Sequence, residues 1–580
     1  MNETKHKNAK YEAVITSCIS LLTVTGIMLI FYFVFGIYYE TNDDRTITEF
    51  LSGVLTGAPD GNTVYNNYLL GKVLALFFTV TKAIPWYGLF LFISHIASYF
   101  VILYGLLLQC KTFKSKCLGC LAGIVLILCN MPSVLQMQYT STAGFLAVAG
   151  YVWLIADEDS KWRKYVVFTV FEFISLQLRT QSMAMVQPIG LLFVASYYIL
   201  PLVSGEKEWK RYFKRVLFPV GMIAVAMVLT FLTNVYPGKQ YTEAWKTYKD
   251  FNDARTMIFD YSYISDEEAL QPILEKYGVE QEELAAFRQY WMLGNPIPTE
   301  CLEEIYESVK PVEEEAFFTP DLLKSLLRYR FSGENFHLGR CAFLGYVLVT
   351  MAIVFSGKWK FLIPLGAVNV GRLGLLLYLM YHARLPFRVI SILYFAELAF
   401  MILLAFLIFR EVEWKKWKQA LVILYLLGSV LVFTKFFYSN QLYLAEKNRV
   451  AEIACEGLVE IYDYCDMHPG KYVVENAACT WYVSDIFDTR VYHSRNLLVA
   501  GGWYSFSPEI VAYEKKYLAQ DGETYIVFRT NVDEVKEHYV YKYLVNAKGC
   551  ELIWRDHIDI ITGDRLEVYQ LIGEYPYEDR

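Results

Sequence analysis

The sequence predicts an α-helical protein that crosses a membrane many times and carries an α/β domain at its C-terminal end. Three observations predict this fold class. Of the 580 residues, 55% are hydrophobic and 19% are charged, whereas soluble proteins average about 45–50% apolar and about 25% charged residues. The hydrophobic residues gather in long runs, and runs 13–38 and 83–110 contain no Asp, Glu, Lys or Arg. From residue 439 onward the composition returns to that of a soluble domain.

Eleven runs are long and apolar enough to cross the hydrocarbon core, which requires about 20 residues of helix. A single run of this kind is often a buried core helix, but eleven together predict membrane spans. The first run is too long for the core of a signal peptide. The runs are residues 13–38, 83–110, 117–135, 139–156, 165–182, 183–203, 216–236, 339–357, 361–381, 389–409 and 419–438.

The loops between these runs alternate between basic and non-basic. Lysine and arginine gather in loops that fall at every second connection, and such loops normally stay in the cytoplasm. We therefore expect a multi-pass protein of the plasma membrane with a cytoplasmic N-terminus and an extracytoplasmic C-terminus. The basic loops are residues 5–10, 111–116, 161–164, 207–215, 358–360 and 410–418.

The large polar segments all fall on the predicted outer side. We expect a transmembrane domain, residues 1–438, that carries an outer loop at 39–82 and a helical outer insert at 237–338. Residues 439–580 are expected to form an extracytoplasmic α/β domain, whose size is typical of a domain. Because the cytoplasmic loops are short, the protein is predicted to work on its outer face.

Several elements of the outer segments can be placed. The apolar residues Ile47, Phe50, Leu51, Val54 and Leu55 recur at helical spacing, which favours a helix on the membrane surface. Residues 67–82 form either a second interfacial helix or part of a span. In the C-terminal domain we expect a helix at 445–466, strands at 471–476 and 523–529, and a hairpin that turns at Thr562–Gly563.

The sharpest chemical feature is the acidic pair Asp43–Asp44, which directly follows the first span. Three roles are open for the pair. One carboxylate can act as a general base toward an acceptor hydroxyl, or the two can hold a divalent cation that neutralises a phosphate. Alternatively, one Asp caps a helix that begins near Thr46.

This layout resembles the GT-C class of integral membrane glycosyltransferases, which includes protein O-mannosyltransferases and lipid A aminoarabinose transferases. The shared features are a first span, an acidic pair in the first outer loop, many further spans and an outer C-terminal domain. The resemblance implies that Asp43 is catalytic, that Asp44 assists it, and that the donor is a polyprenyl-linked sugar. Many members have a second acidic residue or His in a later outer loop, but residues 130–142 contain none. That turn offers Gln136, Gln138 and Tyr139 instead.

This departure weighs against a metal site shared by two loops. A general base remains open, as does a divalent metal with a ligand from the insert, such as Asp253 or Asp260. We expect Gln138 and Tyr139 to belong to the substrate site.

A lipid phosphate requires cations at the level of the outer headgroups, and arginine matches phosphate best. Arg179 lies near the outer end of the fifth span, and Arg384 and Arg388 flank a short outer turn. The alternative is that these side chains merely reach toward lipid headgroups. Arg255 is a further candidate, although a local pair with Asp253 or Asp260 on an exposed helix is an alternative.

Trp503 follows two glycines in the outer domain and would stack on a sugar ring, unless it is simply a buried residue of a turn.

Three charged residues fall near the centres of predicted spans: Glu172, Arg372 and Glu397. Such charges normally pair inside a bundle, so a Glu–Arg clamp is expected. If they line a pathway instead, the protein is a transporter or flippase of lipid-linked glycans. His95 is expected to be a hydrogen-bonded residue of the bundle.

The sequence thus predicts a glycosyltransferase that takes a sugar from a polyprenyl-linked donor in the membrane and passes it to a glycan, lipid or protein of the cell envelope. Besides a transporter, a non-catalytic envelope scaffold stays open. The formal charge of −7 argues against nucleic acid as a partner.

Overall fold

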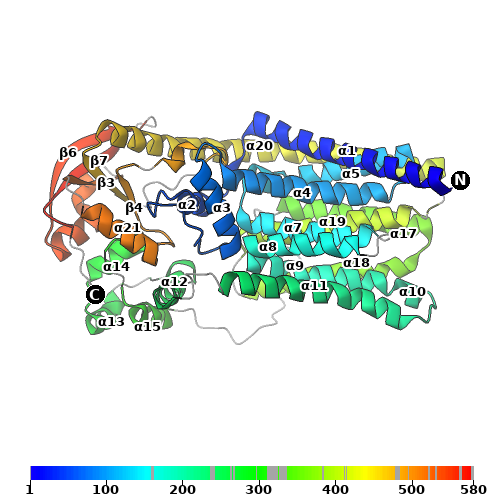
Figure 1. The fold of residues 1–580 in the computed structure, drawn as a ribbon, viewed down its shortest axis with the longest axis horizontal. Coiled ribbons are helices and arrows are strands. Elements are labelled where there is room, and N and C mark those ends of the chain that lie inside the picture. Colours follow the sequence, from blue (N-terminus) through cyan, green and yellow to red (C-terminus); the bar gives the residue numbers. More distant parts are fainter. Residues whose placement is uncertain are drawn as a thin grey trace.

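The computed structural model is an elongated molecule with a helix bundle at one end and a mixed α/β domain, predicted above to be the outer domain and called so below, at the other (Figure 1). The structure describes residues 2–575 except 158–161, 236–241, 262–263, 265–267, 295–296, 310–323, 325–335, 382–384, 411, 413–414, 477–483, 494, 520–522, 530–531 and 561–564.

A helix occupies each of the eleven predicted runs. Among the described residues, seven helices are long and apolar enough to cross a membrane, namely α1, α4, α7, α11, α17, α18 and α19. The prediction of a multi-pass helical membrane protein is therefore confirmed. The eleven helices are α1 (Asn2–Phe35), α4 (Trp86–Leu108), α5 (Phe113–Cys129), α7 (Tyr139–Ala156), α8 (Arg163–Leu178), α9 (Thr180–Tyr198), α11 (Trp209–Val235), α17 (Phe336–Ser356), α18 (Leu362–Tyr381), α19 (Phe387–Phe409) and α20 (Lys416–Met467).

Helices α7 and α19 form the centre of the bundle. Every residue of α7 is buried, as is α19 from Ile390 to its end. The two helices approach closely at Gly144, where a Cβ atom would lie 2.4 Å from the Ile392 side chain. Small residues commonly permit this kind of contact inside membranes.

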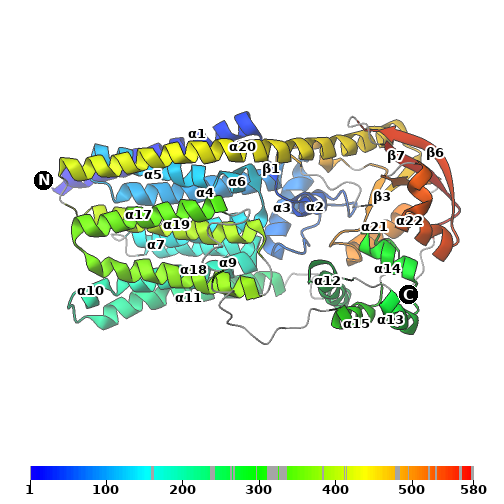
Figure 2. The same ribbon diagram turned by 180° about the vertical axis from the view of Figure 1, so that it is seen from behind.

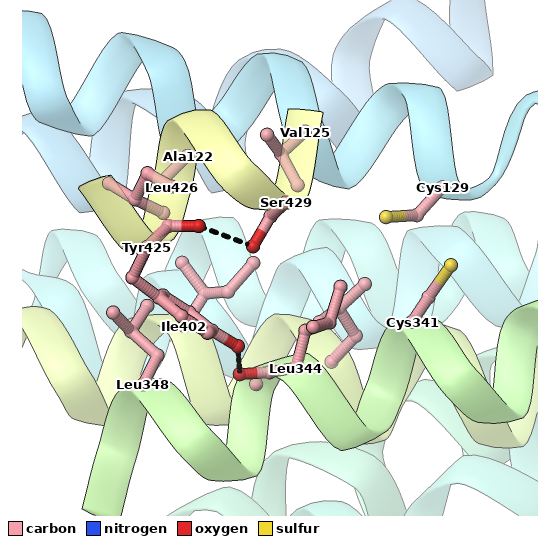
Figure 3. A pocket seen from close by; sticks show the side chains of 12 residues that line it. Ala122, Val125, Cys129, Cys341, Leu344, Leu348, Ile402, Tyr425, Leu426 and Ser429 are labelled. Carbon is pink, nitrogen blue, oxygen red and sulfur yellow. Dashed lines mark hydrogen bonds between the residues drawn. The ribbon is translucent and has the colours of Figure 1, made fainter. Parts of the chain in front are cut away.

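The seam between α20 and the bundle is shown in Figure 3. The Tyr425 hydroxyl of α20 donates a hydrogen bond of 2.7 Å to the carbonyl of Leu344 on α17, and Ser429 donates to the Tyr425 carbonyl at 2.8 Å. Cys129 of α5 and Cys341 of α17 face each other across the same seam. These contacts hold α20 against α5 and α17.

Helix α20 corrects the prediction of a span at 419–438 and a separate helix at 445–466. It runs as one 52-residue helix from Lys416 to Met467, and Figure 2 shows it along most of the molecule's length. Because a residue of helix rises 1.5 Å, α20 is about 78 Å long. One continuous helix therefore joins the bundle to the outer domain across the predicted boundary at 438.

Between the bundle and the outer domain lie helices α2 (Asn42–Ser52) and α3 (Tyr68–Val80). The apolar face of α2 is buried, with Ile47, Phe50 and Leu51 all fully inaccessible. Phe50 stacks on Trp503 of the outer domain with ring centroids 6.0 Å apart. The expectation that this face lies on the membrane surface is thus wrong, because protein covers it.

The described part of the segment predicted as an insert, residues 237–338, contains several helices. It contains α12 (Glu243–Tyr261), α13 (Gln271–Tyr277), α14 (Gln281–Arg288) and α15 (Thr299–Val309). Its own apolar core includes Phe251, Leu274 and Ile305. Trp291, which follows α14, joins a second core in the C-terminal domain, so the insert and that domain pack together.

The outer domain contains a five-stranded sheet of order β4-β3-β5-β7-β6. Strand β3 (Lys471–Asn476) pairs in parallel with β4 (Leu497–Ala500) and with β5 (Glu523–Phe528). Strands β6 (Glu551–Asp559) and β7 (Arg565–Ile572) form the predicted antiparallel hairpin, whose turn lies outside the described residues. The short strand β4 escaped prediction. The carboxyl ends of the parallel strands face the insert, since Asn476 donates to the Gln289 carbonyl at 2.9 Å.

Candidate active site at the outer end of the bundle

A two-residue ladder brings the first outer loop to the turn before α7. Strand β1 (Tyr38–Tyr39) pairs in parallel with β2 (Gln136–Met137), and the Glu40 amide donates to the Met137 carbonyl at 2.9 Å. As a result, α2 and α7 begin side by side. The acidic pair and residues 138–139, both singled out from sequence, therefore meet in one place.

Asp44 is fully buried in this junction. Its Oδ1 accepts hydrogen bonds from the Tyr87 hydroxyl of α4 at 2.8 Å and from the Tyr139 amide of α7 at 3.0 Å. Burial raises the pKa of the Asp44 carboxyl well above its ordinary value, and the charge of Asp43 adds to the rise. Asp44 thus links three helices and favours its neutral form.

Asp43 is half-buried and faces positive charge. Burial raises the pKa of the Asp43 carboxyl, and nearby cations counteract part of this rise, Arg388 first and Arg179 second. Smaller opposing contributions come from the indole of Trp503 and from Arg255. The arginines come from α19, from the α8–α9 junction and from α12. Cations from three distant segments thus lie near enough for their charges to act on one carboxylate.

The expected helix cap is corrected in one respect. Helix α2 begins at Asn42 rather than near Thr46, and its N-cap residue is Thr41. Asp43 and Asp44 therefore occupy the first helical turn, where negative charge is favoured by the helix dipole. Neither carboxylate serves as the cap residue.

Aromatic rings form a wall beside these groups. The Arg179 guanidinium carbon lies 4.8 Å from the ring centre of Tyr65 and 5.2 Å from that of Tyr139. Those two rings stack with centroids 5.6 Å apart, and Trp503 lies 4.6 Å from Tyr65. Burial, followed by the charge of Asp43, raises the pKa of Tyr65 to about 12. Tyr65 was missed because nothing in its local sequence separates it from other loop tyrosines.

Trp503 reaches the site from the carboxyl end of β4. Gly501 and Gly502 adopt φ values of +103° and +102°, which glycine tolerates and other residues rarely do. The Trp503 carbonyl accepts from the Tyr248 hydroxyl of α12 at 2.5 Å. Its indole Nε1 is buried without a hydrogen-bond partner, although it lies near enough to Asp43 to lower the pKa of that carboxyl. A donor is thus held ready beside Asp43.

Arg255 is 7% exposed and donates to Asn252 Oδ1 at 3.1 Å and 3.0 Å. The expectation of an exposed helix face is therefore wrong at Arg255. Asp253 and Asp260 are both exposed. Asp260 lies the nearer of the two to the site, since its charge acts on Tyr65.

Of the remaining predicted residues, Gln138 is the N-cap of α7, and its Oε1 accepts from the Thr140 amide at 2.6 Å. Its Nε2 is buried without a partner. Arg384 lies outside the described residues. Within the described part of the chain, no three His, Cys, Asp or Glu residues are grouped closely enough to hold a metal ion. The charges that act on Asp43 most strongly are those of Arg388 and Arg179.

Each of the three charged residues at the centres of the spans has a polar partner, but only two of them form an ion pair. Arg372 Nε and Glu397 Oε1 lie 3.0 Å apart, which confirms the predicted clamp. Glu172 instead accepts from Gln187 of α9 at 2.9 Å. His95 lies 2.9 Å from the Thr142 hydroxyl, as expected of a bundle residue.

No protein-family model and no curated protein matches the sequence. Among solved structures, the crystal structure of ArnT from Cupriavidus metallidurans bound to undecaprenyl phosphate is similar to this chain. The match covers 97% of this chain and 96% of that one, with 11% identity and a TM-score of 0.33.

Proposed function

We propose that the protein is a membrane glycosyltransferase. It moves a sugar from a polyprenyl-linked phosphate donor to a hydroxyl group of a cell-envelope acceptor on the outer face of the membrane. Asp43 is the general base. The observation that carries this proposal is the meeting of one half-buried carboxylate with three arginines from three separate segments.

The charges of this site fit a phosphate. Arg388, Arg179 and Arg255 supply three positive charges, which Asp43 and Glu40 oppose, whereas Asp44 favours its neutral form. The planar guanidinium group binds phosphate oxygens in pairs, so these arginines suit a phosphate group. Arg388 and Arg179 are on bundle helices or between them, at the level where a lipid phosphate would enter. We therefore assign the donor phosphate to these two residues.

The transfer requires only groups of this chain and its two substrates. Asp43 accepts the proton of the acceptor hydroxyl while that oxygen forms a bond to the anomeric carbon. The bond between the anomeric carbon and the phosphate oxygen breaks at the same time, and its electron pair leaves with the lipid phosphate. Arg388 and Arg179 stabilise the charge that gathers on the leaving group. No step is assigned to a metal ion.

Trp503, Tyr65 and Tyr139 form the wall that would receive the sugar. The indole N–H of Trp503 lies beside Asp43, where a sugar hydroxyl or ring oxygen could also accept from it. Arg255 and the insert stand on the outer side of this wall, where the acceptor would bind. Asp44 acts as a positioning residue, because its two hydrogen bonds fix the start of α7 and the hydroxyl of Tyr87.

The test uses membranes that contain the wild type, Asp43→Asn, Asp44→Asn or Glu172→Gln. Each receives a panel of radiolabelled polyprenyl-phosphate sugars with an envelope extract as acceptor, with and without a chelator. We expect donor consumption by the wild type and by Glu172→Gln, and its loss in Asp43→Asn.

Consumption that survives in Asp43→Asn would contradict the role of Asp43 as base. Loss of consumption in the presence of the chelator would contradict a mechanism without a metal. Loss in Glu172→Gln, together with lipid flipping by the wild type, would favour a transporter instead.

A further inference from the structure

A cavity lies at the opposite end of the bundle from Asp43. Helix α4 begins beside the outer domain, where Gly88 packs on Ile486, and its other end reaches this cavity. The cavity has a volume of about 190 Å³ and lies toward the end of the bundle that is marked N in Figure 1. Its walls are Gln109, Cys110, Lys111, Thr112, Ser115, Leu118, Leu348, Phe406, Phe409, Arg410, Val422 and Leu426.

One side of the cavity is polar and cationic. The Arg410 guanidinium donates to Gln109 Oε1 at 2.9 Å. Gln109 is itself held by bonds from its Nε2 to the carbonyls of Gly105 and Ala156, at 3.2 Å and 3.0 Å. This chain of bonds fixes Arg410 at the wall. Lys111 stands exposed at the same opening.

The start of α5 adds to the positive potential here. Thr112 and Ser115 form a reciprocal cap at its N-terminus. The first turn contains no acidic residue, although the positive end of a helix dipole favours negative charge. Instead, the exposed Lys111 and Lys114 flank it. Their positive charges and the helix start favour an anion in the cavity.

The opposite wall is apolar and continues into the membrane. Leu348 and Leu426 line both this cavity and the narrow apolar cleft between α5, α17, α19 and α20. Figure 3 shows that cleft, with Leu348 and Leu426 at one end and Cys129 and Cys341 toward the other. The cleft has a volume of only about 20 Å³, so a chain would lie along the apolar wall and not fill the cleft. A ligand with an anionic head and an apolar chain matches the polar side of the cavity and this wall. Free phosphate would match only the polar part.

We propose that this cavity binds an anionic phospholipid of the membrane. The phosphate group of the lipid lies against Arg410, Lys111 and the start of α5, and an acyl chain leaves the cavity along its apolar wall at Leu348 and Leu426. The site is separate from the proposed transfer site at Asp43, so its occupancy can be tested without any sugar donor.

The test measures lipid binding to the purified full-length protein in a neutral detergent by native mass spectrometry. Phosphatidylglycerol and phosphatidylcholine with the same acyl chains are titrated separately, and inorganic phosphate is the third probe. The variants are Arg410→Gln, Lys111→Ala and Leu348→Trp. Lys207→Ala is the matched control, because Lys207 is an exposed lysine of another loop that the sequence assigns to the same side and is not part of the cavity wall.

We expect phosphatidylglycerol to bind more tightly than phosphatidylcholine by about tenfold or more. Arg410→Gln should weaken that binding by about tenfold, since hydrogen bonds to charged groups are the stronger ones. Lys111→Ala should weaken it by about fivefold. Lys207→Ala should weaken it by less than about twofold, because salt screens the interaction between the charge of Lys207 and a lipid bound in the cavity. Leu348→Trp keeps every charge but fills the apolar wall of the cavity, so it should also weaken the binding of phosphatidylglycerol.

Equal weakening by Lys207→Ala and Lys111→Ala would overturn the proposal, because general surface attraction would then explain the binding. Binding of inorganic phosphate that matches the lipid in affinity would overturn the assignment to a lipid. Unchanged binding of phosphatidylglycerol by Leu348→Trp would also overturn the assignment to a lipid. The melting temperature of each variant without added lipid is recorded first, so that a misfolded variant is replaced by Arg410→Lys or Leu348→Phe.

Discussion

Replacing Asp44 by Ala and by Asn separates a positioning role from a catalytic one. In Asp44→Ala, the Tyr87 hydroxyl and the Tyr139 amide lose their shared acceptor. Each becomes a buried donor without a partner, which costs about 1–3 kcal/mol. The free energy of unfolding should therefore fall by about 2–6 kcal/mol. Asp44→Asn retains an Oδ1 acceptor and should lose less than about 1 kcal/mol.

The assay is SDS titration of the purified protein in mixed micelles, followed by helical circular dichroism. Donor consumption by Asp44→Asn, scaled to folded protein, should stay within about tenfold of the wild type, because the neutral amide resembles the neutral carboxyl that burial favours. The reasoning is refuted if Asp44→Ala is as stable as the wild type. It is equally refuted if Asp44→Asn is folded but as inactive as Asp43→Asn.

The same residue predicts a pH dependence of stability. Burial raises the pKa of Asp44 in the folded state above its ordinary value of about 3.9. The folded state therefore binds this proton more tightly than the unfolded state, and the stabilisation is lost as the pH rises from about 4 through the raised pKa. Asp44→Asn should flatten that slope, which the same SDS titration at several pH values measures. An unchanged slope would mean that the proton is bound elsewhere.

Three further predictions follow from single contacts. Arg372→Met leaves Glu397 buried without its ion-pair partner and should destabilise the bundle by about 3–5 kcal/mol; a stable variant would contradict the clamp. Gly501→Ala places a methyl group where φ is +103°, so it should displace Trp503 and slow transfer more than it lowers the melting temperature. Arg388→Gln should raise the KM for the lipid donor by about tenfold or more, and an unchanged KM would remove Arg388 from the phosphate site.

The helices of the bundle could be predicted from the sequence because apolar runs of span length have few alternatives. Helix α7 begins and ends at the predicted residues, Tyr139 and Ala156. Strand β3 likewise matches residues 471–476. The spacing of apolar residues shows which face of a helix is apolar, however, and not what covers that face. The face of α2 is therefore covered by Trp503 and its neighbours, although its spacing equally suits a membrane surface.

The candidate site was accessible from sequence only in part. Asp43, Arg179, Arg388 and Trp503 each stand out, because a charge at a membrane boundary or an aromatic residue after two glycines is unusual. Their meeting in one place depends on long-range pairing, such as the ladder between β1 and β2. The burial of Arg255 and the position of Tyr65 depend on the same contacts, which no local pattern contains. For that reason Tyr65 was missed.

No local feature of the sequence predicts that α20 continues as one helix past residue 438. Residues 438 and 439 separate an apolar run from a polar one, and composition changes there although the helix does not end. Helix-forming residues on both sides permit either outcome. The structure shows one helix, so composition boundaries and element boundaries differ at this point.

The most direct test of the account compares Asp43→Asn with the wild type in single-turnover reactions of purified protein, with donor binding measured on the same samples. General base catalysis typically contributes about 10²–10⁴-fold. We expect Asp43→Asn to bind the lipid-linked donor at least as tightly as the wild type, because Asn removes a negative charge from beside the phosphate. We expect its rate of sugar transfer to fall by that factor. A transfer rate within tenfold of the wild type, in a variant that binds donor normally, would contradict the assignment of Asp43 as the base.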